Sequence, residues 1–404
     1  MDSKLQATPP YGVGLAVLAL AVGGLAIGTG EFAAMSILPD VARNLDISVP
    51  KMGHMISAYA LGVVVGAPLI TILCASLPKR FMLIALMLMF AAGNLMGTIF
   101  TTYDGVMISR FIAGIPHGAY FGLAALVAAS LVDRRHRGRA VSRVMMGLTI
   151  ANIIGVPFAT WLGQLLGWQW VFNIVGALGL LTALMVFIFV PKVQLAQSSV
   201  TQELSVFTRP QVWLTLGVVA IGFGGVFSVY TYITPTLVEV TGLQEGVVPL
   251  VLGLFGVGMT LGAWIGGWLA DRSRIWTIVG GLIWNMLVLS LFTVGVQHVW
   301  SAVTMVFLVG MSIAVVPAAQ TRLMDVAGDA QSVAAALNHS AFNIANAIGA
   351  WFGGVVISMH YGWAATGWAG VMLAVGGLVI MFFSILLERR RPITYVETDF
   401  QMVH

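Results

Sequence analysis

Charged residues are scarce in this sequence. Asp, Glu, Lys and Arg together make up 8% of the 404 residues, whereas hydrophobic residues make up 59%. Soluble domains contain roughly 25% charged residues, so the composition excludes a soluble globular protein and indicates an integral membrane protein. The formal net charge of +4 is small and dispersed along the chain, and we therefore expect no nucleic-acid partner.

Cysteine is almost absent as well. Cys74 is the single cysteine, which excludes an internal disulfide framework and a cysteine-based zinc or iron–sulfur site. The sequence also lacks a His-Glu-x-x-His metal motif, a Gly-x-Ser-x-Gly elbow and a phosphate-binding loop. We therefore expect no cofactor, no metal site and no enzymatic activity.

Long apolar runs are abundant. Runs of about 20 apolar residues are long enough to cross a bilayer as helices, and about twice as long as barrel strands. The first run follows Met1-Asp2-Ser3-Lys4 and exceeds the roughly 7–15 residues of a signal-peptide core, so we expect it to remain as a helix. The sequence predicts an all-α membrane protein with twelve spans, at 12–37, 53–76, 80–101, 104–131, 139–164, 168–190, 211–238, 246–270, 275–296, 298–321, 332–358 and 362–387.

The basic residues predict how these spans are oriented. With a cytoplasmic N-terminus, 16 of the 19 Lys and Arg residues fall in cytoplasmic segments. Arg43 and Lys51 fall in outer loops, and Arg110 falls inside a span. Cytoplasmic loops carry an excess of Lys and Arg, so we expect both termini in the cytoplasm. The basic run 134–139 is also suited to contact anionic lipid headgroups.

An internal duplication divides the chain. Residues 150–158 and 344–352 are identical at six of nine positions, 194 residues apart, and Gly62-x-x-x-Gly66-Ala67 recurs as Gly258-x-x-x-Gly262-Ala263 at an offset of 196. Two pseudo-symmetric six-helix bundles are typical of transporters that rock around a midplane site. We expect a monomer with an N-terminal bundle (1–190), a cytoplasmic linker (191–210), a C-terminal bundle (211–390) and a cytoplasmic tail (391–404).

Four stretches carry a resemblance to a known family. They are Gly30-Glu31-Phe32 followed by 38–42, the run 110–119 with its R-x-x-x-G pattern, the Gly/Pro-rich stretch 147–163, and the glycine-rich run 266–274 that contains Asp271 and Arg272. Together they resemble the major facilitator superfamily, specifically its twelve-helix drug:proton antiporter branch, and most closely bacterial arabinose efflux permeases and chloramphenicol resistance exporters.

The resemblance implies a function. It implies proton-coupled export of small organic molecules, such as drugs or sugars, across the bacterial inner membrane. Uptake of a sugar or metabolite together with protons on the same fold is the alternative. By the same resemblance we expect gating or conformational roles for Gly66, Gly155, Pro157, Asp271 and Arg272. The repeat places Ala75 where Asp271 stands, so the charge-pair latch of the family is not carried over to the first half.

Two charged side chains lie well inside the predicted spans, Glu31 and Arg110. Ionisable residues inside a membrane normally face the bundle interior and pair. We therefore interpret Glu31 as the proton-coupling carboxyl, with its protonation governed by Arg110 and by burial. The alternatives are that Glu31 is a helix-end residue near the outer interface, and that Arg110 anchors backbone carbonyls of span 5. Asp40 is interpreted as a solvated loop or cap residue.

Uncharged polar residues extend the candidate site. His339, Asn343 and Asn346 share one face of span 11 because they are four and three residues apart. Hydrogen bonding between helices, or a position in an interfacial aromatic belt, is the alternative role for such side chains, and His339 is also able to accept a proton. Besides Glu31 and Arg110, the expected substrate-binding residues are His117, Asn152, Tyr230, Tyr232, Asn338, His339, Asn343 and Asn346.

Overall fold

The computed structural model describes residues 12–73, 77–100, 102–133, 136–192, 205–328 and 331–390. Lys4, Ala75, Arg134 and Arg135 lie outside these ranges, as do residues 193–204 of the expected linker and the expected tail. All regular secondary structure in the described residues is helical, and twelve helices are long and apolar enough to span a membrane. The expected twelve-helix fold class is therefore confirmed.

In the described residues, the first six spans are built from eight α-helices and a π-helical turn. The second and third helices, α2 (Leu38–Asn44) and α3 (Val49–Met52), connect the first two spans. The spans themselves are α1 (Val13–Ser36), α4 (His54–Leu73), α5 (Lys79–Ile99), α6 and α7 (Tyr103–Gly114 and His117–Ser130), α8, η2 and α9 (Arg137–Ile150, Ala151–Gly155 and Val156–Leu166), and α10 (Gln169–Phe189).

The second six spans follow the short η3 (Ser205–Thr208). Short segments η4 (Thr236–Val240), η5 (Glu245–Val247) and η7 (Trp363–Ala365) lie between the spans. The spans are α12 and α13 (Pro210–Gly222 and Gly224–Tyr230) with α14 (Ile233–Pro235), α15 (Val248–Ala270), α16 (Arg274–Gly295), α17, η6 and α18 (Val299–Met311, Ser312–Ala314 and Val315–Ala327), α19 (Gln331–Ser358), and α20 (Thr366–Arg390).

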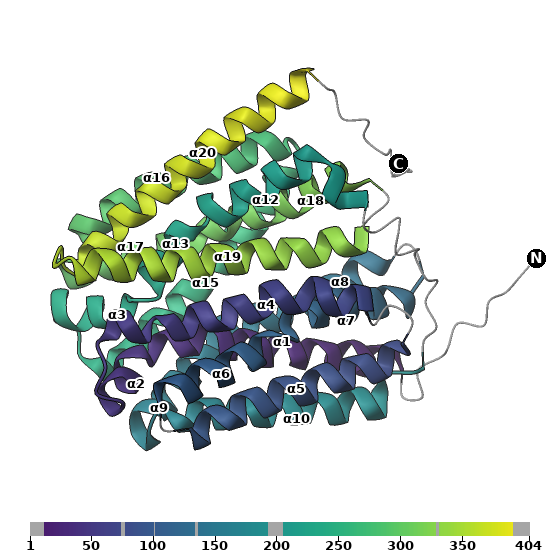
Figure 1. Cartoon of the computed structure of the whole chain (residues 1–404), viewed down its shortest axis with the longest axis horizontal. Helices are drawn as coiled ribbons and strands as arrows, with labels where there is room; N and C mark the ends of the chain where they lie inside the picture. The colour runs from purple at the N-terminus through teal and green to yellow at the C-terminus, as the bar shows by residue number, and fades with distance from the viewer. Residues whose placement is uncertain are drawn as a thin grey trace, which may run out of the picture.

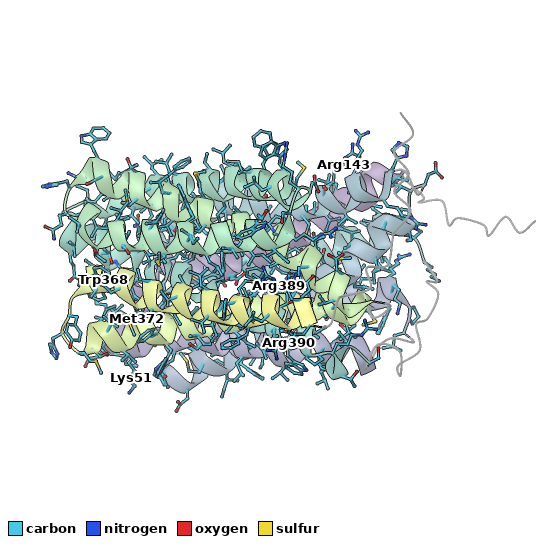
Figure 2. The ribbon with its side chains drawn as sticks, turned by 90° about the horizontal axis from the view of Figure 1, so that it is seen from above. Lys51, Arg143, Trp368, Met372, Arg389 and Arg390 are labelled. Atoms are coloured by element: carbon cyan, nitrogen blue, oxygen red, sulfur yellow. The ribbon has the colours of Figure 1, made fainter. Side chains whose placement is uncertain are left out.

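The two bundles lie against each other along α4 and α19. Figure 1 shows the first bundle (purple through blue to teal) below the second (teal-green to yellow), with α4 and α19 side by side between them. Helix α1 begins and helix α20 ends at one end of the molecule, called here the terminal end, and the connections from α2 to α3 and from α19 to α20 lie at the other, the distal end. Figure 2 shows Arg143 toward the terminal end and Lys51 toward the distal end.

Glycines allow the second and fourth spans of each bundle to touch through their backbones. A Cβ atom on Gly62 would lie 2.2 Å from the carbonyl oxygen of Phe111, and one on Gly66 would lie 2.1 Å from that of Ile115. In the second bundle the corresponding distances are 2.2 Å from Gly258 to Phe307 and 2.3 Å from Gly262 to Met311. The partners follow the same offset of 196 as the glycines, so the duplication seen in the sequence is also a duplication of packing.

Proline and glycine reshape two spans. Span 5 contains a π-helical turn at Ala151–Gly155, directly before Pro157, which has no N–H for a regular helical bond. A Cβ on Gly155 would lie 2.3 Å from Oγ1 of Thr29, so this glycine lets span 5 contact span 1. Span 7, expected over 211–238, ends as an α-helix at Tyr230 and resumes as α14 and a π-helical turn around Pro235.

We expect Gly114→Ala to destabilise the protein. A Cβ at Gly114 would lie 2.1 Å from the backbone oxygen of Tyr59, which cannot move without shifting α4. Overpacking of this kind costs about 1–3 kcal/mol. Gly122→Ala in the same span is the matched control, since nothing lies within 4 Å of its added Cβ. Thermal unfolding of the purified protein in detergent measures both, and equal melting temperatures for the two variants would contradict the prediction.

Candidate functional site

Arg110 is buried in the interior of the first bundle. It is 2% exposed, and its guanidinium lies over the rings of Tyr59 and Phe172, 4.5 Å and 5.2 Å from their centroids. It donates hydrogen bonds to the carbonyl oxygen of Gly30 (3.1 Å) and to Oδ1 of Asn94 (3.2 Å). A buried cation needs such partners because it is costly in an apolar medium. Arg110 therefore anchors α1 rather than the carbonyls of span 5, which were the alternative.

Glu31 follows the carbonyl that Arg110 binds and faces the second bundle. Its side chain is buried (7% exposed), so a position at the helix-end interface with lipid headgroups does not apply. Oε1 accepts a hydrogen bond from Nδ2 of Asn346 on α19 at 3.2 Å. Among the described residues, no ion pair joins Glu31 to Arg110. The guanidinium instead binds the carbonyl oxygen of Gly30, the residue before Glu31 in α1. The carboxyl is thus placed at the contact between the two bundles.

His117 lies near Oε2 of Glu31, the carboxylate oxygen that Asn346 does not bind. Its Nδ1 is 4.0 Å from Oε2 of Glu31 and 2.9 Å from the hydroxyl oxygen of Tyr59. Its ring centroid lies 5.9 Å from that of His339 on α19. Glu31, Tyr59, His117, His339 and Asn346 thus form one group across the interface, called here the central cluster. The structure brings together five side chains from α1, α4, α7 and α19.

The asparagines that the sequence singled out differ in their bonding. Asn343 donates to the carbonyl oxygen of His339 (3.0 Å) and Asn152 to that of Leu148 (2.9 Å), both within their own helices. Asn346 instead bonds across the bundle interface. Buried polar atoms normally have partners. The amide oxygens of Asn152, Asn338, Asn343 and Asn346 are buried without one in the described part of the chain, as is that of Asn285 on α16, and they are able to accept hydrogen bonds from a ligand or water.

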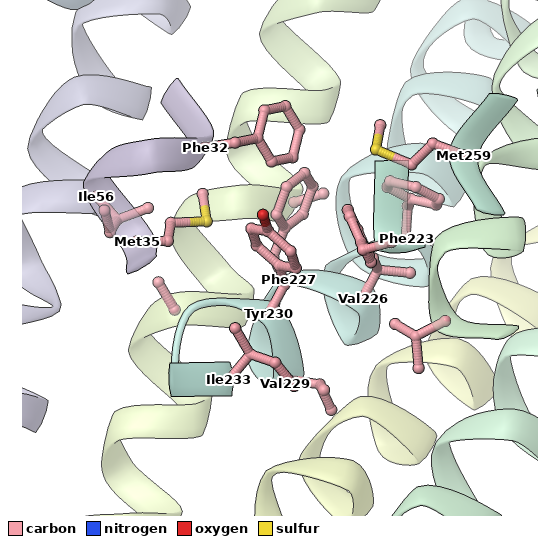
Figure 3. Packing of buried hydrophobic residues seen from close by; sticks show 14 of the residues in the cluster. Phe32, Met35, Ile56, Phe223, Val226, Phe227, Val229, Tyr230, Ile233 and Met259 are labelled. Carbon is pink, nitrogen blue, oxygen red and sulfur yellow. The ribbon is translucent and has the colours of Figure 1, made fainter. Parts of the chain in front are cut away.

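Tyr230 and Tyr232 lie in different surroundings. The Tyr230 ring packs 4.1 Å from that of Phe255 and 5.6 Å from that of Phe32 in the first bundle, and its hydroxyl has no protein partner. Figure 3 shows this aromatic contact beside Phe227. Tyr232 instead donates to the carbonyl oxygen of Ala350 at 2.7 Å. Tyr230 is therefore available to a ligand, whereas Tyr232 is engaged in packing.

The distal half of the interface is closed by contacts between the bundles. Thr234 donates to the carbonyl oxygen of Ser36 at 2.9 Å, and Gln164 donates to that of Glu245 at 3.0 Å. A Cβ on Gly53 would lie 2.4 Å from the hydroxyl oxygen of Tyr232, so this tyrosine of the second bundle is wedged against the first. Separation of the bundles at this end requires breaking these contacts.

The acidic residues near the two ends differ in their surroundings. Asp40 lies in the first turn of α2, is partly exposed and pairs with Arg43 at 3.5 Å. Burial raises the pKa of the Asp40 carboxyl, and Arg43 opposes this shift. At the terminal end Asp271 is exposed and makes no ion pair within the described residues. Arg272 lies over the ring of Trp268, 3.4 Å from its centroid. No bond of Asp271 or Arg272 to the first bundle occurs in the described ranges.

Residues missed by the sequence analysis complete the site. Asn94 and Tyr59 hold Arg110 and His117, yet neither belongs to a motif. The sequence signal that could have identified Asn94 was a polar side chain within an apolar span.

At the terminal end, Arg274 pairs with Asp325 (3.0 Å) and buried Arg322 with Glu388 (2.9 Å), beside a cavity of about 190 Å³ within the second bundle. Among the described residues, no group of three His, Cys, Asp or Glu side chains is placed to hold a metal ion.

Comparisons with known proteins agree with this architecture. The Major Facilitator Superfamily model matches residues 20–338 and 241–398. The chain is 41% identical to the inner membrane transport protein YdhP of Escherichia coli (strain K12), over 94% of this chain and 97% of that protein. It is 28% identical to a chloramphenicol resistance protein of Streptomyces lividans, over 92% and 97%.

A solved structure has the same fold. It is a bacterial homologue of the human lysosomal transporter Spinster, in an inward-facing and unoccupied conformation. The TM-score is 0.68 at 16% sequence identity, and the match covers 95% of this chain and 96% of that one. At this identity the likeness concerns the fold alone.

We expect Asn94→Leu to destabilise the protein, because it leaves a hydrogen bond of buried Arg110 unmade. Loss of a partner for a buried charged group costs about 1–3 kcal/mol or more. Asn285→Leu on α16 is the matched control. Asn285 is equally buried, but neither polar atom of its amide has a hydrogen-bond partner in the described chain. Thermal unfolding in detergent should show a lower melting temperature for Asn94→Leu and no loss for Asn285→Leu; the reverse order would refute the role of Asn94.

Proposed function

Because this chain belongs to the major facilitator superfamily, we propose that it is a proton-coupled antiporter that exports small organic molecules from the cell. Membership makes it a multi-pass transporter of the inner membrane and not an enzyme. The direction of transport, the coupling ion and the residues that carry it are the proposal. The observation that carries it is the placement of Glu31 between the two bundles.

We propose that both termini are cytoplasmic. This orientation places 16 of the 19 Lys and Arg residues on the cytoplasmic side, as the positive-inside rule requires. The terminal end then faces the cytoplasm, and the contacts of Tyr232 and Thr234 close the external side. In this state substrate would enter from the cytoplasm.

Protonation of Glu31 is proposed to control the contact between the bundles. An ionised carboxylate in an apolar interface is costly unless it is paired. Here the pairing donor, Asn346, belongs to the other bundle. A change in the charge of Glu31 therefore changes the free energy of bringing the bundles together at this point, which is how a proton shifts a two-state equilibrium. Substrate bound at the unpaired amide oxygens of α19 would compete for the same interface.

The energetics suit export. At roughly 150 mV the entry of one proton supplies about 3.5 kcal/mol. Since each 1.4 kcal/mol is worth a factor of ten, that energy sustains a gradient somewhat above two decades for a neutral substrate. The name of the Streptomyces relative, a chloramphenicol resistance protein, is consistent with removal of a small organic compound from the cell. The cargo proposed here is a small organic molecule, drugs and sugars included.

We expect Glu31→Gln to abolish proton coupling. Everted membrane vesicles with an acidified interior and a pH-sensitive dye would be exposed to compounds selected by growth inhibition of an efflux-deficient host. With wild-type protein an exported compound should release protons from the vesicles. Glu31→Gln should remove this release because the amide cannot take up a proton.

Asp40→Asn is the control variant, because it also replaces a carboxyl group by an amide. Asp40 is also partly buried but lies in α2, where it pairs with Arg43, and proton release should persist in this variant. Proton release by Glu31→Gln equal to that of wild type would reassign the coupling residue. Acid-stimulated uptake into right-side-out vesicles would instead establish the symport alternative.

A further inference from the structure

We propose that Tyr59, His117 and His339 form a proton relay that connects Glu31 with the terminal end of the molecule. The inference rests on the proposed proton coupling and adds the route by which the proton reaches or leaves the carboxyl. It assigns to the two histidines a role in moving protons in place of the substrate contact expected from the sequence.

The first step of the relay joins Glu31 to His117. Oε2 of Glu31 and the hydroxyl oxygen of Tyr59 both lie near Nδ1 of His117, at 4.0 Å and 2.9 Å. The longer distance exceeds that of a hydrogen bond. Proton transfer between Glu31 and His117 therefore requires the carboxylate to rotate toward Nδ1, whereas the Tyr59 hydroxyl is already in hydrogen-bond contact with that nitrogen. Imidazole then accepts a proton at one nitrogen and releases one from the other, so the proton count is conserved.

The second step joins His117 to His339 across the bundle interface. Their ring centroids are 5.9 Å apart. Phe121 contacts both, with its ring 5.4 Å from His117 and parallel to His339 at 5.3 Å, which orients the second imidazole. Gly118 allows the close approach, since a Cβ there would lie 3.3 Å from Cβ of His339. The two imidazoles are thus held next to each other by packing from both bundles.

The difference in solvent exposure among the relay residues indicates to which end of the molecule the proton is carried. Glu31, Tyr59 and His117 are buried, whereas His339 is only half-buried. The distal half of the interface is closed by the contacts of Tyr232 and Thr234, so the route that remains from His339 leads to the terminal end. Glu31 and His117 belong to the first bundle and His339 to the second. Separation of α7 from α19 breaks the relay, and proton exchange with the terminal side is therefore restricted to the conformation seen here.

The surroundings contain few competing groups. From α6, Arg110 lies over the ring of Tyr59 and binds the carbonyl oxygen of Gly30. From α7, the hydroxyl of Tyr120 donates to the carbonyl oxygen of Leu20. From α19, the neighbours are neutral amides. Imidazole is able to accept a proton at one nitrogen and to release one from the other near neutral pH, which suits the two histidines to proton transfer.

The test follows protonation of Glu31 directly and needs no substrate. The purified full chain in lipid bilayers is subjected to a pH jump, and infrared absorption of the protonated carboxyl is recorded over time. The Glu31 band is the one missing from Glu31→Gln. We expect His117→Asn and His339→Asn to reach the wild-type amplitude at acidic pH but about 100-fold more slowly, the lower end of what a positioned acid–base group contributes. Tyr59→Phe, which keeps the ring under Arg110, should also be slower.

His54→Asn is the matched control. His54 lies on α4 five residues from Tyr59, but it is exposed and bonded to Tyr103 at 2.8 Å, so its rate should equal that of wild type. Melting temperatures verify that each variant is folded. Wild-type rates in both His117→Asn and His339→Asn would overturn the relay while leaving Glu31 as the coupling carboxyl. Absence of any Glu31 band in wild type at acidic pH would overturn the relay and the proposed coupling together.

Discussion

The hydrogen bond from Asn346 to the carboxylate of Glu31 is the interaction on which the rest of the site depends. It joins a titratable group of one bundle to a neutral donor of the other, at an interface that the two halves must break to change conformation. If the hydrogen-bond donor to Glu31 belonged to the same bundle, protonation of Glu31 would not change the free energy of separating the two bundles at this contact. In the proposed antiport, this position between the bundles would allow protonation of one side chain to change how the two bundles pack together.

The first bundle supports this carboxyl through a chain of fixed groups. Asn94 and two aromatic rings hold Arg110, Arg110 holds the carbonyl before Glu31, and Tyr59 orients His117 beside it. The second bundle repeats the packing but not the charges. At the repeat offset of 196, Val306 replaces Arg110 and Phe227 replaces Glu31. Duplication thus preserved the backbone contacts at the glycines, while Glu31 and Arg110 of the first half are replaced by apolar residues at the matching positions of the second.

Much of the fold could be predicted because its determinants are local. An apolar run of sufficient length must be a helix in a bilayer, since no other isolated segment satisfies its own backbone. Paired glycines recur where the second and fourth spans of each repeat touch. The candidate site was harder to predict from the sequence. Glu31 and Arg110 were found because charge is costly in a membrane, but their partners Asn94 and Tyr59 look like ordinary residues of apolar spans.

The sequence by itself determined the number of spans, their duplication, and the burial of Glu31 and Arg110, because burial cost and helix length depend on composition over short stretches. Only the tertiary structure decided that Glu31 bonds to a residue 315 positions away, that Arg110 binds the backbone next to that carboxyl, and that Tyr232 is engaged in packing. These outcomes depend on how two bundles pack and on which rotamers fill the interface. That information is held in no single segment.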